Sequence, residues 1–144
     1  MVAKPVPGKR YFTVEQANAT LPLVRVIVHD ITELARELRD RHERLSRIRP
    51  GQRGRSDAHE EELLQAQSDF EKGKERMQEY QRELAQLGIE LKDYFSGLID
   101  FPCWMDGREV YLCWRQGEAE VGHWHELDAG FAGRRKLLLE AGPR

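Results

Sequence analysis

The chain has 144 residues, 40% of them hydrophobic and 33% charged, which suits one domain of ordinary size in which long polar stretches form an extended element. Two cysteines, Cys103 and Cys113, are too few for a disulfide framework, so both are expected as free thiols. No segment approaches the apolar length that spans a bilayer, and residues 1–12 lack the apolar stretch of a signal peptide. We therefore expect a cytoplasmic protein with no membrane partner.

Residues 12–88 are predicted to form a helical hairpin. Thr13 and Gln16 make a capping box, and Pro22 is expected to end a short first helix and to open a longer one. Apolar residues then recur at spacings of three and four in two runs, separated by Pro50-Gly51. The runs are Val24, Ile27, Ile31, Leu34, Leu38, Arg41, Leu45 and Ile48, followed by Leu63, Ala66, Phe70, Gly73, Met77, Tyr80, Leu84 and Leu87.

Two such helices joined by a short loop fold back as a coiled-coil-like antiparallel pair. If Leu45 lies near Leu63, then Arg41 faces Gln67, with Asp69 close by, in a polar layer that fixes the register. At about 1.5 Å per residue the first long helix measures roughly 40 Å, so the tip of the hairpin must lie far from whatever packs at its base.

After Gly88 the hydrophobic period changes from helical to two, which predicts a small antiparallel sheet over residues 89–135. Asp106-Gly107 between two hydrophobic runs is a strong hairpin signal, because both turn positions require a positive φ. The elements expected next are a strand at 110–115, a turn at 116–119 and a strand at 120–125. The predicted fold class is therefore α+β, with a meander of three or four strands beside the hairpin.

The turn lengths determine which residues of neighbouring strands face each other. The two-residue Asp-Gly turn sets Asp100 opposite Cys113, and a turn at 116–119 sets Leu112 opposite His123. A slip of one residue in either turn would move some side chains to the other face. The face expected to pack on the helices holds Ile99, Phe101, Cys103, Val110, Leu112, Trp114, Val121, His123 and His125. The opposite face holds Asp100, Trp104, Tyr111, Cys113, Arg115, Trp124 and Glu126.

Four stretches of the chain carry a resemblance to a known family. They are FTVEQAN at 12–18, LGIELKDYFSGLIDFP at 87–102, DGREVYLCW at 106–114 and WHELDAGFAGR at 124–134. Together they resemble an uncharacterised bacterial family, the domain-of-unknown-function family twenty-two-oh-three. The resemblance implies kinship with cytosolic bacterial proteins and brings no activity with it. Its most specific stretch carries Trp124, His125, Glu126, Asp128, Gly130, Gly133 and Arg134.

The polar and aromatic face of the sheet is the expected ligand-binding pocket, because aromatic walls exclude water while a few polar groups orient a ligand. A loop at 128–135 adds two glycines and two arginines that are suited to hold an anion. The alternative is that Arg134 forms a salt bridge with Glu126 or Asp100 and that the glycines only turn the chain. The candidate ligand-binding residues are Asp100, Tyr111, Cys113, Arg115, Trp124, Glu126 and Arg134.

A metal site is a second hypothesis for this region. His123 and His125 project to one side of a strand, so both imidazoles can reach one zinc or iron ion, with Asp128 or Cys103 as a third ligand. The favoured alternative is that these histidines pack at the end of the core face and that no cofactor binds. Cys113 is not expected to act as a nucleophile, because a neighbouring carboxylate raises the pKa of a thiol.

The tip of the hairpin, residues 47–55, is rich in arginine. Residues 1–55 carry 12 Lys/Arg against 6 Asp/Glu, and this excess is concentrated near the tip. Arginine forks match phosphate oxygens, which predicts contact with an acidic protein or a nucleic acid; the alternative is a solvated connecting loop. The candidate anion contacts are Arg47, Arg49, Arg53 and Arg55.

The sequence thus predicts the location of a functional site but not the chemistry of that site. We expect a single domain over residues 1–144, with a tail at 136–144, that acts as a cytosolic binding or interaction module through the sheet pocket, the tip or both. A homodimer formed through the hairpins is an open alternative. The alternative function is that of a metal-dependent enzyme with its site around His125.

Overall fold

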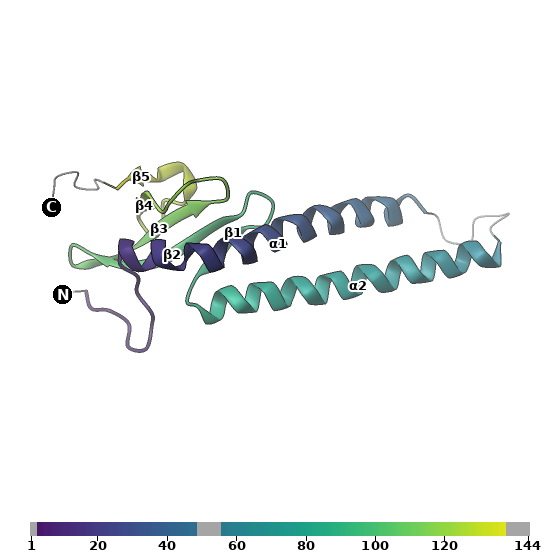
Figure 1. Cartoon of the computed structure of the whole chain (residues 1–144), viewed down its shortest axis with the longest axis horizontal. Helices are drawn as coiled ribbons and strands as arrows, with labels where there is room; N and C mark the ends of the chain where they lie inside the picture. The colour runs from purple at the N-terminus through teal and green to yellow at the C-terminus, as the bar shows by residue number, and fades with distance from the viewer. Residues whose placement is uncertain (1–2, 49–55, 138–144) are drawn as a thin grey trace.

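The computed structural model describes residues 3–48 and 56–137 as a pair of long helices and a five-stranded antiparallel sheet, an α+β fold (Figure 1). Helix α1 (Val14–Ser46) packs on the sheet with its first half, and α2 (Asp57–Gln86) runs back beside α1. The sheet has the strand order of the chain. Its strands are β1 (Glu90–Asp93), β2 (Leu98–Met105), β3 (Arg108–Arg115), β4 (His123–His125) and β5 (Arg135–Lys136), with the 3-10 helix η1 (Phe131–Gly133) between the last two.

Helix α1 begins at the predicted capping box. The Thr13 hydroxyl accepts a hydrogen bond from the Gln16 main-chain N–H at 3.0 Å, and the Gln16 side chain accepts one from the Thr13 N–H at 2.9 Å. The prediction that Pro22 separates two helices is wrong, since α1 continues through the proline. Leu21 and Val24 on either side of Pro22 are buried in the core, and this packing holds both turns in place although one main-chain hydrogen bond is lost.

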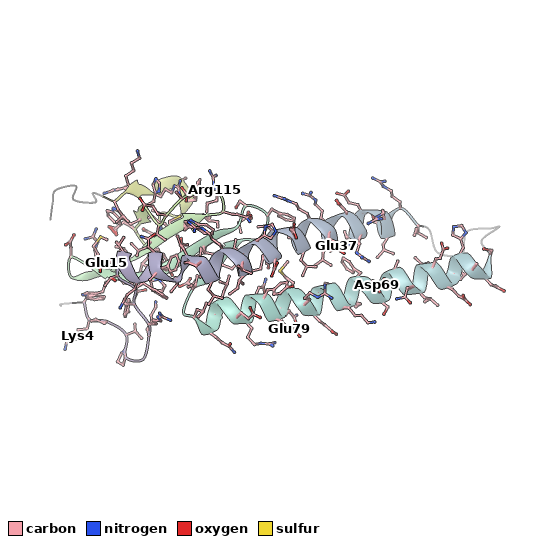
Figure 2. The ribbon with its side chains drawn as sticks, viewed as in Figure 1. Lys4, Glu15, Glu37, Asp69, Glu79 and Arg115 are labelled. Atoms are coloured by element: carbon pink, nitrogen blue, oxygen red, sulfur yellow. The ribbon has the colours of Figure 1, made fainter. Side chains whose placement is uncertain are left out.

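The two helices extend beyond the sheet as an arm (Figure 1). Arg41 of α1 forms ion pairs with Glu37 at 2.9 Å and with Asp69 of α2 at 3.7 Å, which confirms the predicted polar layer. Glu37 and Asp69 lie on the two paired helices of the arm (Figure 2). Among the described residues, burial in α1 ends at Ala35 and burial in α2 starts only at Gly73. The distal half of the arm therefore adds little to the core.

The inner face of the sheet packs on α1 and is apolar. The register of β2 and β3 is the predicted one, because Asp106 and Gly107 take φ angles of 52° and 78° in a two-residue turn that sets Asp100 opposite Cys113. The buried side chains of this face are Ile99, Phe101, Cys103, Val110, Leu112, Trp114 and Val121. All of them belong to the predicted core face.

The register of β3 and β4 differs from the prediction by one residue. Cys113 faces His123 and Tyr111 faces His125, whereas the expected turn at 116–119 would set Leu112 opposite His123. The cause lies outside the sheet. The Asn18 side chain of α1 accepts from the main-chain N–H of Val121 at 2.7 Å and donates to its carbonyl at 3.3 Å, so this segment bonds to a helix and β4 begins only at His123. Both histidines consequently lie on the face opposite the core.

A fifth strand replaces part of the predicted loop. Arg135 and Lys136 pair with Trp124 and His123 of β4, and the Leu137 N–H donates to the Gly122 carbonyl at 2.9 Å. A strand of two residues shows no hydrophobic period, which explains why the sequence analysis expected three or four strands. Across residues 3–48 and 56–137, neither helix has a stretch that is both long and apolar enough to cross a bilayer.

The segment before α1 is tied to β3 through Glu109, and this contact predicts a pH effect. Lys9 Nζ lies 2.5 Å from the Glu109 carboxylate and the Tyr11 hydroxyl donates to it at 2.7 Å. Burial of the Glu109 carboxylate by itself raises its pKa, but these hydrogen bonds outweigh burial, so the pKa of Glu109 is lowered. A carboxyl whose folded pKa is depressed stabilises the fold above its unfolded pKa of about 4.3, and this contribution disappears as the pH falls through the folded value.

We therefore expect the melting temperature to fall on acidification from about pH 5 to pH 3. Glu109→Gln should make this fall smaller, because it removes a pH-dependent contribution of up to about 1 kcal/mol to the free energy of unfolding. Thermal melts by circular dichroism across this range measure the effect. Glu79→Gln, at an exposed position of α2, is the matched control. Identical pH profiles of melting temperature for wild type and Glu109→Gln would contradict the assignment of this acid sensitivity to Glu109.

Candidate metal centre on the outer face of the sheet

The face of the sheet turned away from α1, here called the outer face, carries a row of polar side chains. Glu90, Asp100, Cys113 and His123 face one another in sequence across β1, β2, β3 and β4. His125 lies two residues further along β4, opposite Tyr111. Alternation along each strand brings these side chains to one side, because their neighbours on β2 and β3 fill the core.

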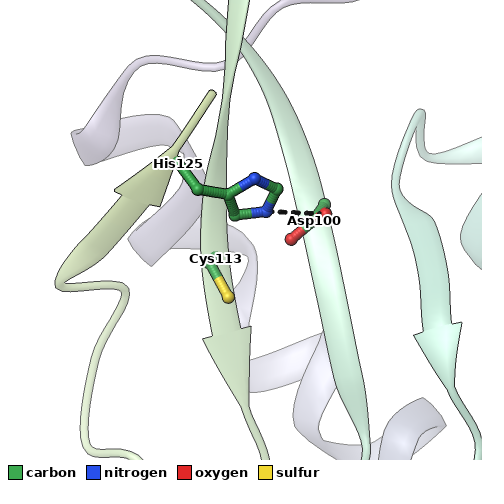
Figure 3. A group of neighbouring side chains, drawn as sticks. All are labelled: Asp100, Cys113 and His125. Atoms are coloured by element: carbon green, nitrogen blue, oxygen red, sulfur yellow. Dashed lines mark hydrogen bonds and ion pairs between the residues drawn. The ribbon is translucent and has the colours of Figure 1, made fainter. Parts of the chain in front are cut away.

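Asp100, Cys113 and His125 form a compact buried group within this face (Figure 3). One carboxylate oxygen, the sulfur and one imidazole nitrogen all lie within 4.8 Å of one another. The three residues are only 2%, 0% and 2% exposed. His125 Nε2 on β4 is 3.0 Å from Asp100 Oδ2 on β2, across the intervening strand β3. Side chains of three different types that can act as metal ligands thus converge at one point.

The hydrogen bonds of His125 fix the tautomer of its ring. Nδ1 lies 2.7 Å from the main-chain carbonyl oxygen of Glu126, and a carbonyl can only accept, so Nδ1 carries a proton. Nε2 and Asp100 then share one further proton between them. Burial raises the pKa of Asp100, although the hydrogen bond to His125 works in the other direction. Asp100 Oδ1 is buried and has no hydrogen-bond partner.

Cys113 is a protonated thiol at neutral pH. Burial, and after it the charge of Asp100, raises its pKa to about 11, and this outweighs the Arg134 guanidinium, whose Nη1 is 3.9 Å from the sulfur. A thiol in this state is a poor nucleophile. The same sulfur becomes a strong ligand when a bound metal ion displaces its proton.

Glu118 and Arg134 lie beside this group. Arg134 donates two hydrogen bonds to the Glu118 carboxylate, at 3.0 and 2.6 Å, in a bidentate pair. Arg134 thus pairs with Glu118 and not with Glu126 or Asp100; Glu126 is bonded to Arg108 instead. The main-chain N–H of Arg115 also donates to Glu118, at 2.7 Å.

His123 lies at the edge of the same cluster. Its Nδ1 is buried without a hydrogen bond and is 3.7 Å from Glu118 Oε2. Burial, followed by the charge of Arg134, lowers the pKa of His123, so the ring is neutral at pH 7 and is able to act as a metal ligand.

Comparison with known proteins identifies the family. The family model of the uncharacterized conserved protein DUF2203 matches residues 10–137. The chain belongs to the DUF2203 family. No curated protein and no solved structure matches it. The matched range contains Asp100, Cys113 and His125, so the buried group lies inside the DUF2203 domain.

The DUF2203 fold distributes the other predicted site residues over several places. The Tyr111 hydroxyl donates to Glu90 at 2.9 Å, and its ring packs on His125 with centroids 5.4 Å apart. Arg115 stacks on Phe131 of η1 at 5.1 Å. Trp124, predicted on the outer face, is instead directed toward the core face, because the register shift reverses its side.

The remaining predicted residues lie away from the group. Asp128 is exposed, and Cys103 is buried on the opposite, core face of the DUF2203 sheet. Arg47 caps α1 at the far end of the arm and is exposed, while Arg49, Arg53 and Arg55 lie outside the described residues. The C-terminal end of α1, which precedes the predicted tip, lies at the end of the arm away from the sheet (Figure 1).

Sequence reasoning missed the role of Glu118, because the sequence predicts this residue only as part of a turn at 116–119. A signal was available, because Glu118 is an acid within a connection that leads to the strand carrying His123 and His125. It also missed Asn18, whose position on α1 gives no local indication that it binds the main chain of Val121.

Proposed function

We propose that this chain is a metal-binding module in which Asp100, Cys113 and His125 hold one divalent transition-metal ion. The observation that carries the proposal is the convergence of three buried ligand atoms of different chemistry within 4.8 Å. Ligand atoms bound to one tetrahedral zinc ion at about 2.0–2.3 Å lie roughly 3.3–3.8 Å apart, so only small movements are needed to close the site.

The donor set favours zinc, with iron as the second choice. A thiolate and an imidazole select borderline or soft transition metals, whereas magnesium and calcium prefer oxygen ligands throughout. Asp100 and Cys113 bind as anions, and their two negative charges balance a divalent ion in a buried position.

Two features of the surroundings support a metal over a simple hydrogen-bonded pair. The Nδ1–H of His125 donates to a main-chain carbonyl, which is the usual outer-shell arrangement of a metal-binding histidine and leaves Nε2 for the ion. Asp100 Oδ1 is buried without a partner, an unfavourable situation that a bound cation would relieve.

The proposal is one of binding and not of catalysis. All three ligands are almost completely inaccessible to solvent, so a substrate has no direct approach to the ion. A metal in this place ties β2, β3 and β4 together. The proposal further assumes the cytoplasm of a bacterium, which the motif resemblance implies and where Cys113 would be kept from disulfide formation.

Metal content tests the proposal. The full-length, untagged protein should carry about one zinc or iron per chain by elemental analysis, or take up one equivalent of Co²⁺ with thiolate-to-metal charge-transfer absorption. Cys113→Ser should abolish both signals, because it removes the strongest ligand while conserving side-chain size. Cys103→Ser is the matched control, since Cys103 is also buried, but on the opposite face.

The proposal fails if the wild-type protein binds neither zinc, iron nor cobalt. It also fails if Cys103→Ser lowers metal content as much as Cys113→Ser does, because a general loss of packing would then explain both. Circular dichroism of each variant verifies that the fold is retained.

The arm suggests a second, independent function as an interaction element. Among the described residues, its distal half holds no fully buried side chain, so its length is not explained by the stability of the core. Contact with an acidic protein or a nucleic acid through the arginine-rich tip, or with the arm of a second chain, stays a prediction from the sequence.

A further inference from the structure

The described chain has two buried side-chain atoms with no hydrogen-bond partner, Asp100 Oδ1 and His123 Nδ1. Both belong to the outer face of the sheet, and both flank Cys113. Buried polar atoms are nearly always satisfied in folded proteins, so two such atoms on either side of one thiol require an explanation. Asp100 is already a ligand in the proposed metal centre; His123 is not.

The register places His123 in line with that centre. Asp100, Cys113 and His123 face one another directly across β2, β3 and β4, so Cys113 occupies the middle strand. Adjacent strands are about 4.8 Å apart and facing Cβ atoms about 4.5–5.5 Å apart. An ion seated over Cys113 is therefore within reach of a side chain from each flanking strand, and His125 reaches it from the next position along β4.

Three protein ligands leave one position of a tetrahedral zinc ion to be filled. The outer face offers few candidates. Both oxygens of Glu118 are engaged by Arg134, and one also accepts from the Arg115 N–H. The Tyr111 hydroxyl is held by Glu90, which also pairs with Lys92 at 2.9 Å. His123 differs from these residues, because its Nδ1 atom makes no hydrogen bond.

We propose that His123 is the fourth ligand and that it closes the site as a structural, tetrahedral zinc centre of one carboxylate, one thiolate and two imidazoles. This inference rests on the proposed metal-binding function. It requires the His123 ring to turn from the Glu118 carboxylate, 3.7 Å away, toward the Cys113 sulfur on the facing strand. The arrangement gives the His-x-His spacing of β4 a purpose, since both imidazoles then serve one ion.

Cobalt substitution in the full-length protein tests the inference, because tetrahedral Co²⁺ absorbs far more strongly in the visible range than Co²⁺ with additional water ligands. Wild type should show the tetrahedral spectrum. His123→Ala should keep the thiolate charge-transfer band, shift and weaken the visible bands as one water replaces the imidazole, and bind zinc more than about 100-fold more weakly, beyond the loss typical of an outer-shell partner. His59→Ala, an exposed histidine of α2, is the control.

A second variant adds a gain of signal. His123→Cys under reducing conditions supplies a new thiolate ligand, so the charge-transfer absorption should approximately double while the tetrahedral bands persist. Wild-type spectra in both His123 variants, or an affinity loss below about 100-fold with the tetrahedral bands unchanged, would overturn the fourth-ligand inference and leave the three-ligand site standing. Failure of the wild type to bind cobalt at all would overturn both.

Discussion

Gly97→Ala is expected to destabilise the fold by about 2–5 kcal/mol, although it adds a single methyl group. Gly97 has a φ of +69°, in the region that disfavours any residue with a Cβ. The added carbon would lie 2.7 Å from Val28 Cγ1 and 2.8 Å from Gln116 Cβ. The strain and the clash act together, because Gly97 sits where the turn before β2 meets α1 and the end of β3.

Gly107→Ala is the matched control for this prediction. Gly107 also has a positive φ, +78°, but nothing lies within 4 Å of a Cβ built there. It should therefore show only the backbone strain, about 1–2 kcal/mol. Urea unfolding of the two variants measures the difference. Equal losses would mean that the neighbours of Gly97 move aside freely and that close packing at this junction contributes nothing.

The sequence correctly predicted those features of the fold that depend on local patterns. The polar layer around Arg41 follows from the heptad spacing once Leu45 is placed near Leu63, and the ion pair with Asp69 confirms it. The register of β2 and β3 follows from Asp106-Gly107, because a two-residue turn leaves one pairing. Asp100 and Cys113 were accordingly predicted to face each other, and they do.

The composition of the candidate site could not be predicted, because it depends on a long-range contact. The connection between β3 and β4 is fixed by Asn18, more than one hundred residues before Val121 in the chain. The length of this connection shifts the pairing of β3 and β4 by one residue. A shift of one residue in a strand moves every side chain to the other face of the sheet. His125 thereby leaves the predicted core face and joins Asp100 and Cys113.

The error at Pro22 has the same origin. Local preference favours a helix end before proline, whereas burial of the flanking turns against the sheet favours continuation. Tertiary packing prevails in both cases, and it does so at positions that touch the sheet. Where the chain is exposed, as in the distal arm, helical preference and the structure agree.

Zinc is expected to stabilise the native protein by about 4 kcal/mol when its free concentration is a thousand times the dissociation constant. In the proposed centre the ion would bind ligands from β2, β3 and β4 only when these strands are assembled, so it would favour the folded state by mass action. For a chain of this size the melting temperature should rise by about 10–15 °C. Differential scanning calorimetry of metal-stripped protein, with and without added zinc, measures the shift.

Two variants and two additives make this result specific to the proposed centre. Cys113→Ser should melt at one temperature with or without zinc, whereas Cys103→Ser should respond as the wild type does, because only Cys113 belongs to the converging group. Magnesium should have no effect, since it binds thiolate and imidazole poorly. A chelator should return the wild type to its metal-free melting temperature. A wild-type melt that zinc leaves unmoved would mean that Asp100 and His125 form a hydrogen-bonded pair that only supports the sheet, and that Cys113 fills the space beside them.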